Sequence, residues 1–249
     1  MRLIALIAAL PLTAIPLAAC SFTSGGNDSK PGVTGSGSGT TRSYSVANFT
    51  GVALRGSDDV DVRVGTGFSV RAEGPSEELD RLKIEKVGDT LRIGRINRDG
   101  FNWGGSHKGV KVFVTMPRIA EASIAGSGNL AVDRVEGQSF SGSSAGSGNL
   151  DVAAVNVETG KFSIAGSGSM KLKGNARKLT IDVTGSGDVD APGLTAQGAE
   201  VSVAGSGSVR AAVKGGAAVS VVGSGDVDLG PGARCATSKK GSGEVKCGS

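Results

Sequence analysis

Apolar and polar residues alternate along much of the second half of the chain, and a Gly-Ser-Gly triplet interrupts the alternation at regular intervals. In one typical repeat, Leu179, Ile181 and Val183 precede the triplet, and Val189 and Ala191 follow it. Alternation with a period of two indicates β-strands with one buried face. The triplet between the strands predicts a sharp turn, because glycine adopts backbone angles that other residues avoid.

The triplet recurs with a nearly constant period. Successive first glycines lie 20, 20, 19, 20, 18 and 18 residues apart, at Gly126, Gly146, Gly166, Gly185, Gly205, Gly223 and Gly241. A fixed period near twenty is typical of a solenoid in which each repeat forms one turn. We therefore predict an all-β fold, a parallel β-helix with 18–20 residues per rung. Residues 56–58, Gly-Ser-Asp, fit the same template as an earlier and imperfect copy.

Charged residues recur on the outward side of these predicted strands. From Gly146 onward, the residue five positions after each first glycine is charged, and the sign of the charge alternates over six repeats. These residues are Asp151, Lys171, Asp190, Arg210, Asp228 and Lys246. If the rungs stack in register, these side chains form a charge ladder, in which each exposed pair contributes about 0.2–1 kcal/mol. A slip by one rung would place like charges opposite each other, so the ladder favours a single register.

The last repeat differs from the others at its inward positions. Thr237 and Lys239 stand where earlier repeats carry valine or isoleucine, which predicts a C-terminal cap that protects the end of the solenoid. Cys235 and Cys247 lie six residues before and six after Gly241. In an oxidising compartment a disulfide between them would contribute about 3 kcal/mol. Two free buried thiols are the alternative.

The N-terminus predicts export. Residues 1–19 combine one positive charge, a short apolar run and small residues, as in a secretory signal peptide. The sequence Leu-Ala-Ala-Cys at residues 17–20 is similar to a bacterial lipobox, in which Cys20 carries the lipid; an ordinary signal peptide is the alternative. Ser21, in place of aspartate, resembles the signal for an outer-membrane destination. Residues 20–42 are rich in glycine and serine and predict a flexible tether.

Residues 43–120 are less regular than residues 121–249, which carry the repeats. Alternating runs at residues 60–64, 91–93 and 110–114 predict strands, and residues 75–83 contain a candidate helix start. This part is expected to supply the first rungs and the N-terminal cap. Residues 97–109 form a glycine-rich interruption that includes Phe101, Trp103 and His107, which are candidates for a partner-binding loop or for packing against the solenoid.

Composition excludes several classes of protein. The chain has 42 glycines in 249 residues but only 7 prolines and no Gly-X-Y period, which excludes collagen. With 38% hydrophobic residues it is too apolar to be wholly disordered. A net charge of +4, without a basic stripe, argues against nucleic acid as a partner.

Few residues suit catalysis or metal binding. His107 is the only histidine, so a catalytic triad or a histidine metal site would have to use it. The Gly-Ser-Gly-Asp motifs lack the nonapeptide period of calcium-binding repeats, so we expect no metal and no cofactor. Asp182, Asp188 and Asp190 form the best local carboxylate cluster. A polysaccharide lyase or hydrolase that uses this cluster is the alternative to a non-enzymatic function.

The lipobox, the linker, Val-Thr-Met-Pro at residues 114–117 and the repeated Gly-Ser-Gly-Asp/Asn-Val/Leu units resemble the putative autotransporter adhesin, head GIN domain family. The resemblance covers residues 43–249 and implies a right-handed parallel β-helix on a bacterial envelope protein. It supplies no catalytic residues. We expect a palmitate-bearing outer-membrane lipoprotein that is held to the membrane by its N-terminal lipid. Its solenoid surface would serve adhesion, binding of a glycan or envelope protein, or envelope structure, and it would face either the periplasm or the exterior.

Overall fold

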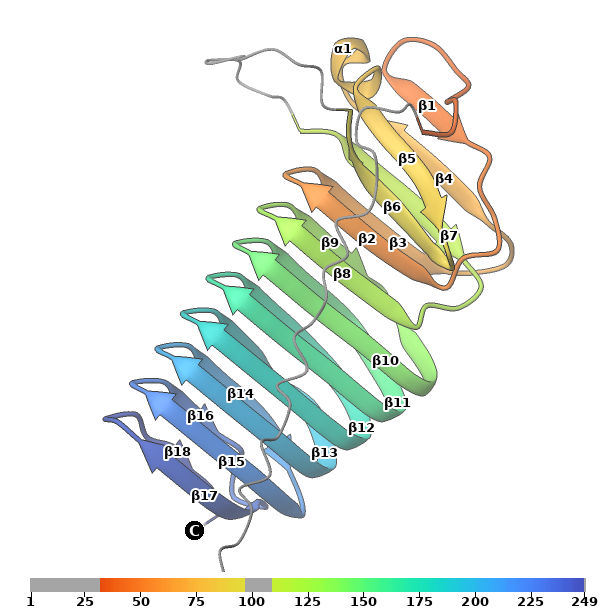
Figure 1. Ribbon diagram of the computed structural model, residues 1–249. Helices are drawn as coiled ribbons and strands as arrows, with labels where there is room; N and C mark the ends of the chain where they lie inside the picture. The colour runs from red at the N-terminus through yellow and green to blue at the C-terminus, as the bar shows by residue number, and fades with distance from the viewer. Residues whose placement is uncertain (1–31, 97–108, 249) are drawn as a thin grey trace, which may run out of the picture.

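The computed structural model describes residues 32–96 and 109–248. Cys20 and the predicted loop residues Phe101, Trp103 and His107 therefore lie outside the described residues. Strand makes up 69% of the structure and helix 2%, and the strands coil into a parallel β-solenoid of about six turns (Figure 1). The fold class predicted from the repeats is confirmed.

The repeats stack as parallel rungs along one axis (Figure 1). The first glycines of six successive triplets are register partners, from Gly126 with Gly146 to Gly205 with Gly223. The strands of these rungs are β8 (Glu121–Gly126), β9 (Asn129–Val132), β10 (Val135–Gly146), β11 (Asn149–Gly166), β12 (Ser169–Gly185), β13 (Asp188–Gly205), β14 (Ser208–Val213), β15 (Gly216–Gly223), β16 (Asp226–Asp228), β17 (Arg234–Lys240) and β18 (Val245–Lys246).

Each triplet turns the chain at the same corner of the coil. Gly166 has a φ of +132°, and a Cβ atom at this residue would lie 2.3 Å from the carbonyl oxygen of Gly146 on the neighbouring rung. The same oxygen accepts a hydrogen bond of 2.8 Å from the backbone N–H of Ser167. Glycine is therefore required for both the backbone angle and the close stacking of the corners. Differences in repeat length are absorbed elsewhere, where the register shifts after Val152 and after Lys171.

Alternate residues of each rung fill a narrow apolar core. Successive inward positions two residues before the triplet are occupied by Ile124, Ser144, Ile164 and Val183, all of which are buried. The hydroxyl of Ser144 donates a 2.9 Å hydrogen bond to the carbonyl of Gly148, so this buried polar group is satisfied. The alternating pattern thus predicted the buried face correctly.

The N-terminal part supplies the first rung. Strands β2 (Gly51–Gly56) and β3 (Asp59–Val64) pair in parallel with β8 and β9, so Gly56 is the register partner of Gly126. On their other side lie β6 (Thr90–Arg95), which is parallel to β2, and β7 (Lys111–Met116), which is parallel to β3. The first rung thus forms although its strands lie far from β8 and β9 in the sequence.

Antiparallel strands close the N-terminal end of the stack (Figure 1). Strand β5 (Leu82–Val87) pairs with β6, β4 (Ser69–Glu73) pairs with β7, and β1 (Thr41–Tyr44) pairs with β4. The helix expected within residues 75–83 is confirmed as the short α1 (Ser76–Leu79). Antiparallel pairing covers strand edges that would otherwise be free to pair with another chain.

Contacts with this end begin within the segment that we expected to be a tether. The backbone N–H of Val33 donates a 2.7 Å hydrogen bond to the carbonyl of Ile84 on β5. Ser36 and Ser43 form an antiparallel bridge around a turn in which Gly37 has a φ of +117°. Backbone hydrogen bonds therefore hold residues 33–42 against the domain, although these residues have few apolar side chains.

The C-terminal rung carries the polar inward residues seen in the sequence. Thr237 and Lys239 are the register partners of Val219 and Val221. The ammonium of Lys239 donates a 2.9 Å hydrogen bond to the carbonyl of Gly243, at a corner with no further rung above it. Cys235 and Cys247 form a disulfide with a Cα–Cα distance of 6.0 Å, which closes the last turn.

Candidate functional site

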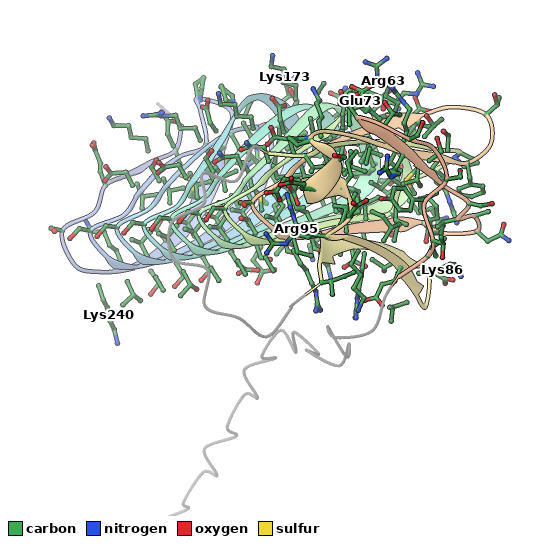
Figure 2. The ribbon with its side chains drawn as sticks, turned by 90° about the horizontal axis from the view of Figure 1, so that it is seen from above. Arg63, Glu73, Lys86, Arg95, Lys173 and Lys240 are labelled. Carbon is green, nitrogen blue, oxygen red and sulfur yellow. A yellow bond between two sulfur atoms is a disulfide. The ribbon has the colours of Figure 1, made fainter. Side chains whose placement is uncertain are left out.

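Two outward faces of the coil meet at the glycine corner. The face before the corner carries small side chains in register, namely Ser123, Ser143, Ser163, Asp182, Ser202, Ser220 and Ser238. The face after the corner carries amide, hydroxyl and charged groups. Charged side chains project on opposite sides of the coil, such as those of Lys173 and Lys240 (Figure 2).

A groove of about 400 Å³ crosses the first rungs of the face after the corner. Its floor contains the buried residues Val60, Leu130 and Leu150. Its polar lining comes from strands β3, β7, β9, β11 and β12, and consists of Asp59, Asp61, Lys111, Asn129, Asn149, Asp151, Ser169 and Lys171. Register brings these residues together, because neighbouring rungs place equivalent positions side by side.

A chain of side-chain hydrogen bonds runs along the groove from rung to rung. The amide of Asn129 donates to the Oδ1 atom of Asp59 at 2.8 Å, and the amide of Asn149 donates to the Oδ1 atom of Asn129 at 2.9 Å. The hydroxyl of Ser169 then donates to the Oδ1 atom of Asn149 at 2.8 Å. Each bond fixes the orientation of the next amide, so the groove presents a pre-ordered row of polar groups.

The same column continues beyond the groove. Asp188 accepts hydrogen bonds from the hydroxyl and the backbone N–H of Ser208 at 2.6 and 2.9 Å, and Asp226 accepts one from the backbone N–H of Glu244 at 2.8 Å. This hydrogen-bonded column was not predicted from the sequence. The signal was present, because Asn, Ser or Asp stands three residues after the first glycine in most copies.

The predicted charge ladder occupies the neighbouring column. Asp151, Lys171, Asp190, Arg210, Asp228 and Lys246 are consecutive register partners. Within the described part of the chain, however, no ion pair of 4.0 Å or less joins two of these six residues. Their alternation therefore acts over longer distances, where solvent and salt screen it strongly.

Asp151 and Lys171 belong to both the ladder and the groove. Neither side chain has a hydrogen-bond or ion-pair partner among the described residues, and both are exposed. Asp61 and Asp151 flank Ala131 in the same column, and the methyl group of Ala131 leaves the space that deepens the groove. Asp151 and Lys171 thus give the groove one carboxylate and one ammonium that have no partner among the described residues.

The carboxylates considered for catalysis do not converge on one face. Asp182 lies before the Gly185 corner, whereas Asp188 and Asp190 lie after it, so the two groups project from different faces. Burial raises the pKa of Asp182 above the ordinary aspartate value; the negative charge of Glu200 adds to this effect and Lys161 partly offsets it. Asp188 is already bound by Ser208. This arrangement contains no paired acid and base.

A buried ionic network stabilises the N-terminal end next to the groove. Asp58, the residue that replaces the second glycine of the triplet in the first copy, is 1% exposed. The guanidinium of Arg95 binds both oxygens of Asp58 and also Glu78 of α1, and it lies at the N-terminal end of the stack in Figure 2. Burial alone would lower the pKa of Arg95, but its bonds to Asp58 and Glu78 raise it.

Within residues 32–96 and 109–248, no group of three or more His, Cys, Asp or Glu side chains is close enough to hold a metal ion. No helix in that part of the chain is long and apolar enough to cross a membrane.

Comparisons with known proteins identify the architecture. Residues 48–230 match the family described as "Putative auto-transporter adhesin, head GIN domain". A crystal structure of a putative adhesin from Bacteroides fragilis is similar, with a TM-score of 0.76 and 22% identity over 83% of this chain and 95% of that chain. A crystal structure of a putative lipid binding protein from Parabacteroides distasonis has a TM-score of 0.68 and 22% identity, over 86% of this chain and 98% of that chain. A putative adhesin from Parabacteroides merdae has a TM-score of 0.65 and 18% identity, over 88% and 99%. No match is found among curated proteins.

Proposed function

Since the chain belongs to the family of putative auto-transporter adhesins with a head GIN domain, we propose that it is a non-enzymatic binding protein of the bacterial cell envelope. Its ligand would be a glycan, bound along the groove on the face after the glycine corner. The protein would be held to the outer membrane by a lipid on Cys20.

The observation that carries this proposal is the ordered row of hydrogen-bonding groups in the groove. Asp59, Asn129, Asn149 and Ser169 hold one another in place, with Asp151 unpartnered beside them. Carboxylates and amides bind sugar hydroxyls well because they accept several hydrogen bonds, and a row already fixed by the rungs loses little entropy on binding. The rungs repeat at about 4.8 Å, so the row suits an extended chain of similar units.

The membrane anchor rests on the sequence. A short signal peptide that ends in Leu-Ala-Ala-Cys is typical of bacterial lipoproteins, in which several acyl chains give stable attachment. Replacement of Cys20 by serine should abolish incorporation of labelled palmitate and release the protein from the membrane fraction. Unchanged labelling in this variant would contradict the anchor. Proteolytic shaving of whole cells then decides whether the solenoid faces the exterior or the periplasm.

The groove is tested with the mature protein on a glycan array, followed by calorimetry with the glycans that bind. Asp151→Asn removes an unpartnered charge at nearly constant size, and we expect it to weaken binding at least about tenfold. Asp190→Asn is the matched control, because Asp190 occupies the same column outside the groove. Equal losses in the two variants, or no glycan bound by the wild type, would contradict binding in the groove.

The same glycans separate binding from catalysis. We expect no release of reducing ends or unsaturated products on prolonged incubation with the mature protein. If products appeared and Asp182→Ala or Asp190→Ala abolished them, the protein would instead be a polysaccharide-processing enzyme.

A further inference from the structure

A second concave site lies at the N-terminal end of the face before the corner, away from the groove. It has a volume of about 220 Å³ and is formed by the ends of β2, β5 and β6. Four of its lining side chains are cationic, Arg55, Lys83, Arg92 and Arg95, and only Glu85 is anionic. Liquid water occupies about 30 Å³ per molecule, so the pocket has room for a small oxyanion together with water.

The cations of this pocket are held at different depths. Lys83 is 5% exposed, and its ammonium lies 3.3 Å from the Oε2 atom of Glu85. Arg95 is engaged by Asp58 and Glu78 behind the pocket. These ion pairs fix two of the cationic side chains in place, so that their positions are set before any ligand binds.

Arg92 is the side chain whose bonds are incomplete. Its Nη1 atom is buried and has no hydrogen-bond acceptor within the described part of the chain. A buried donor without a partner costs about 1–3 kcal/mol, and more when the donor is charged. Buried groups of this kind in folded proteins are normally satisfied by a protein group, a water molecule or an ion. The pocket therefore contains a buried guanidinium nitrogen that has no acceptor among the described residues.

A glycine near the end of β6 lines this pocket. Gly94 lies two residues after Arg92 on β6 and is the register partner of Lys83 on β5. A Cβ atom at Gly94 would lie 3.4 Å from the carbonyl oxygen and 3.5 Å from the Cβ atom of Arg55, which is ordinary contact. A side chain at residue 94 would therefore be tolerated. It would project among the cations of the pocket.

We propose that this pocket binds a phosphate group, either as the free ion or as part of a lipid headgroup. A guanidinium donates two parallel hydrogen bonds to phosphate oxygens, and the neighbouring ammonium and guanidinium groups add charge around a tetrahedral anion. The four cations face three carboxylates, Glu85 in the lining and Asp58 and Glu78 behind it, so a net positive charge remains. The site lies on a different face from the groove and does not depend on the function proposed for the groove.

The first test is thermal unfolding of the mature protein with inorganic phosphate, at an ionic strength kept constant with sodium chloride. At ten times the Kd we expect Tm to rise by about 3 °C. Arg92→Gln should remove this rise. Arg177→Gln should keep it, because Arg177 lies outside the pocket, where its exposed side chain on β12 pairs with Glu158. A rise in Tm of the same size in Arg92→Gln would overturn the proposal. So would a wild type whose Tm does not rise with phosphate and which does not bind the vesicles described below.

A second variant supplies the missing anion from the chain itself. Gly94→Asp places a carboxylate among the cations, so we expect a higher Tm than the wild type without phosphate and no further rise with it. Gly216→Asp is the control, because a side chain at Gly216 would meet nothing within 4 Å. If Gly94→Asp still responded to phosphate as the wild type does, the pocket would not be the binding site.

The source of the phosphate group is decided with vesicles. The mature protein without its lipid is sedimented with phosphatidylcholine vesicles that contain, or lack, about one fifth phosphatidylglycerol. Binding that requires phosphatidylglycerol and is lost in Arg92→Gln assigns a lipid headgroup. A rise in Tm with inorganic phosphate but no vesicle binding assigns a soluble phosphate. Vesicle binding that persists in Arg92→Gln would contradict the role of this pocket.

Discussion

Replacement of Gly166 by alanine tests whether the rung corners need glycine for stacking as well as for backbone angle. The new Cβ atom would lie 2.3 Å from the carbonyl oxygen of Gly146, whereas real contacts of this kind are not below 3.0 Å. The two corners must therefore separate by at least 0.7 Å, the difference between these distances. Gly56→Ala is the control, since Gly56 has a similar φ of +124° but no atom within 4 Å of the new Cβ.

Both variants incur the strain of a positive φ, which costs about 1–3 kcal/mol. Only Gly166→Ala adds the steric overlap, at about 1–3 kcal/mol, and weakens the 2.8 Å hydrogen bond from Ser167 to Gly146, at about 1 kcal/mol. We therefore expect Gly166→Ala to be less stable than Gly56→Ala by about 2–4 kcal/mol. In a domain of this size, the difference corresponds to about 4–16 °C in Tm.

The assay is thermal unfolding followed by circular dichroism, with urea unfolding at 25 °C as a second measurement of the free energy. Gly56→Ala shows the cost of backbone strain by itself, so the comparison isolates the contact between rungs. Equal losses of stability in the two variants would refute the reasoning, because the corners would then adjust to a methyl group without cost.

Three further outcomes follow from the contacts described above. Replacement of Cys235 and Cys247 by serine should lower the free energy of unfolding by about 3 kcal/mol in urea, and reduction of the wild type should match it; equal midpoints would contradict a stabilising disulfide. Asp58→Asn should cost about 3–5 kcal/mol by leaving Arg95 buried without its full partner, and a loss below about 1 kcal/mol would contradict this role. Because the pKa of Asp182 is raised in the folded state, its ionisation destabilises the fold as pH rises through the window between the unfolded and folded values. Asp182→Asn should therefore be more stable than the wild type at pH 7 and equal to it near pH 3, as Tm measurements across this range can show.

The candidate groove could be predicted only in part. Asn129, Asn149 and Asp151 stand at repeated positions, so the sequence places them on one outward face. Asp59, Asp61 and Lys111 could not be assigned to the same face, because they belong to the irregular N-terminal part and reach the groove through the pairing of β3 with β7 and β9. The phosphate pocket was not predicted at all, since Arg55, Lys83 and Arg92 come from three strands without a repeat.

The regular solenoid was determined by the sequence alone. Alternation sets which side chains are buried, and the period of the glycines sets the length of a rung, because both are properties of neighbouring residues. The contacts that fold the N-terminal end were decided by the tertiary structure. There, Asp58 binds Arg95, and β6 and β7 stack on the outer side of β2 and β3. Such pairings join segments of unlike sequence over long loops, so local patterns cannot specify them.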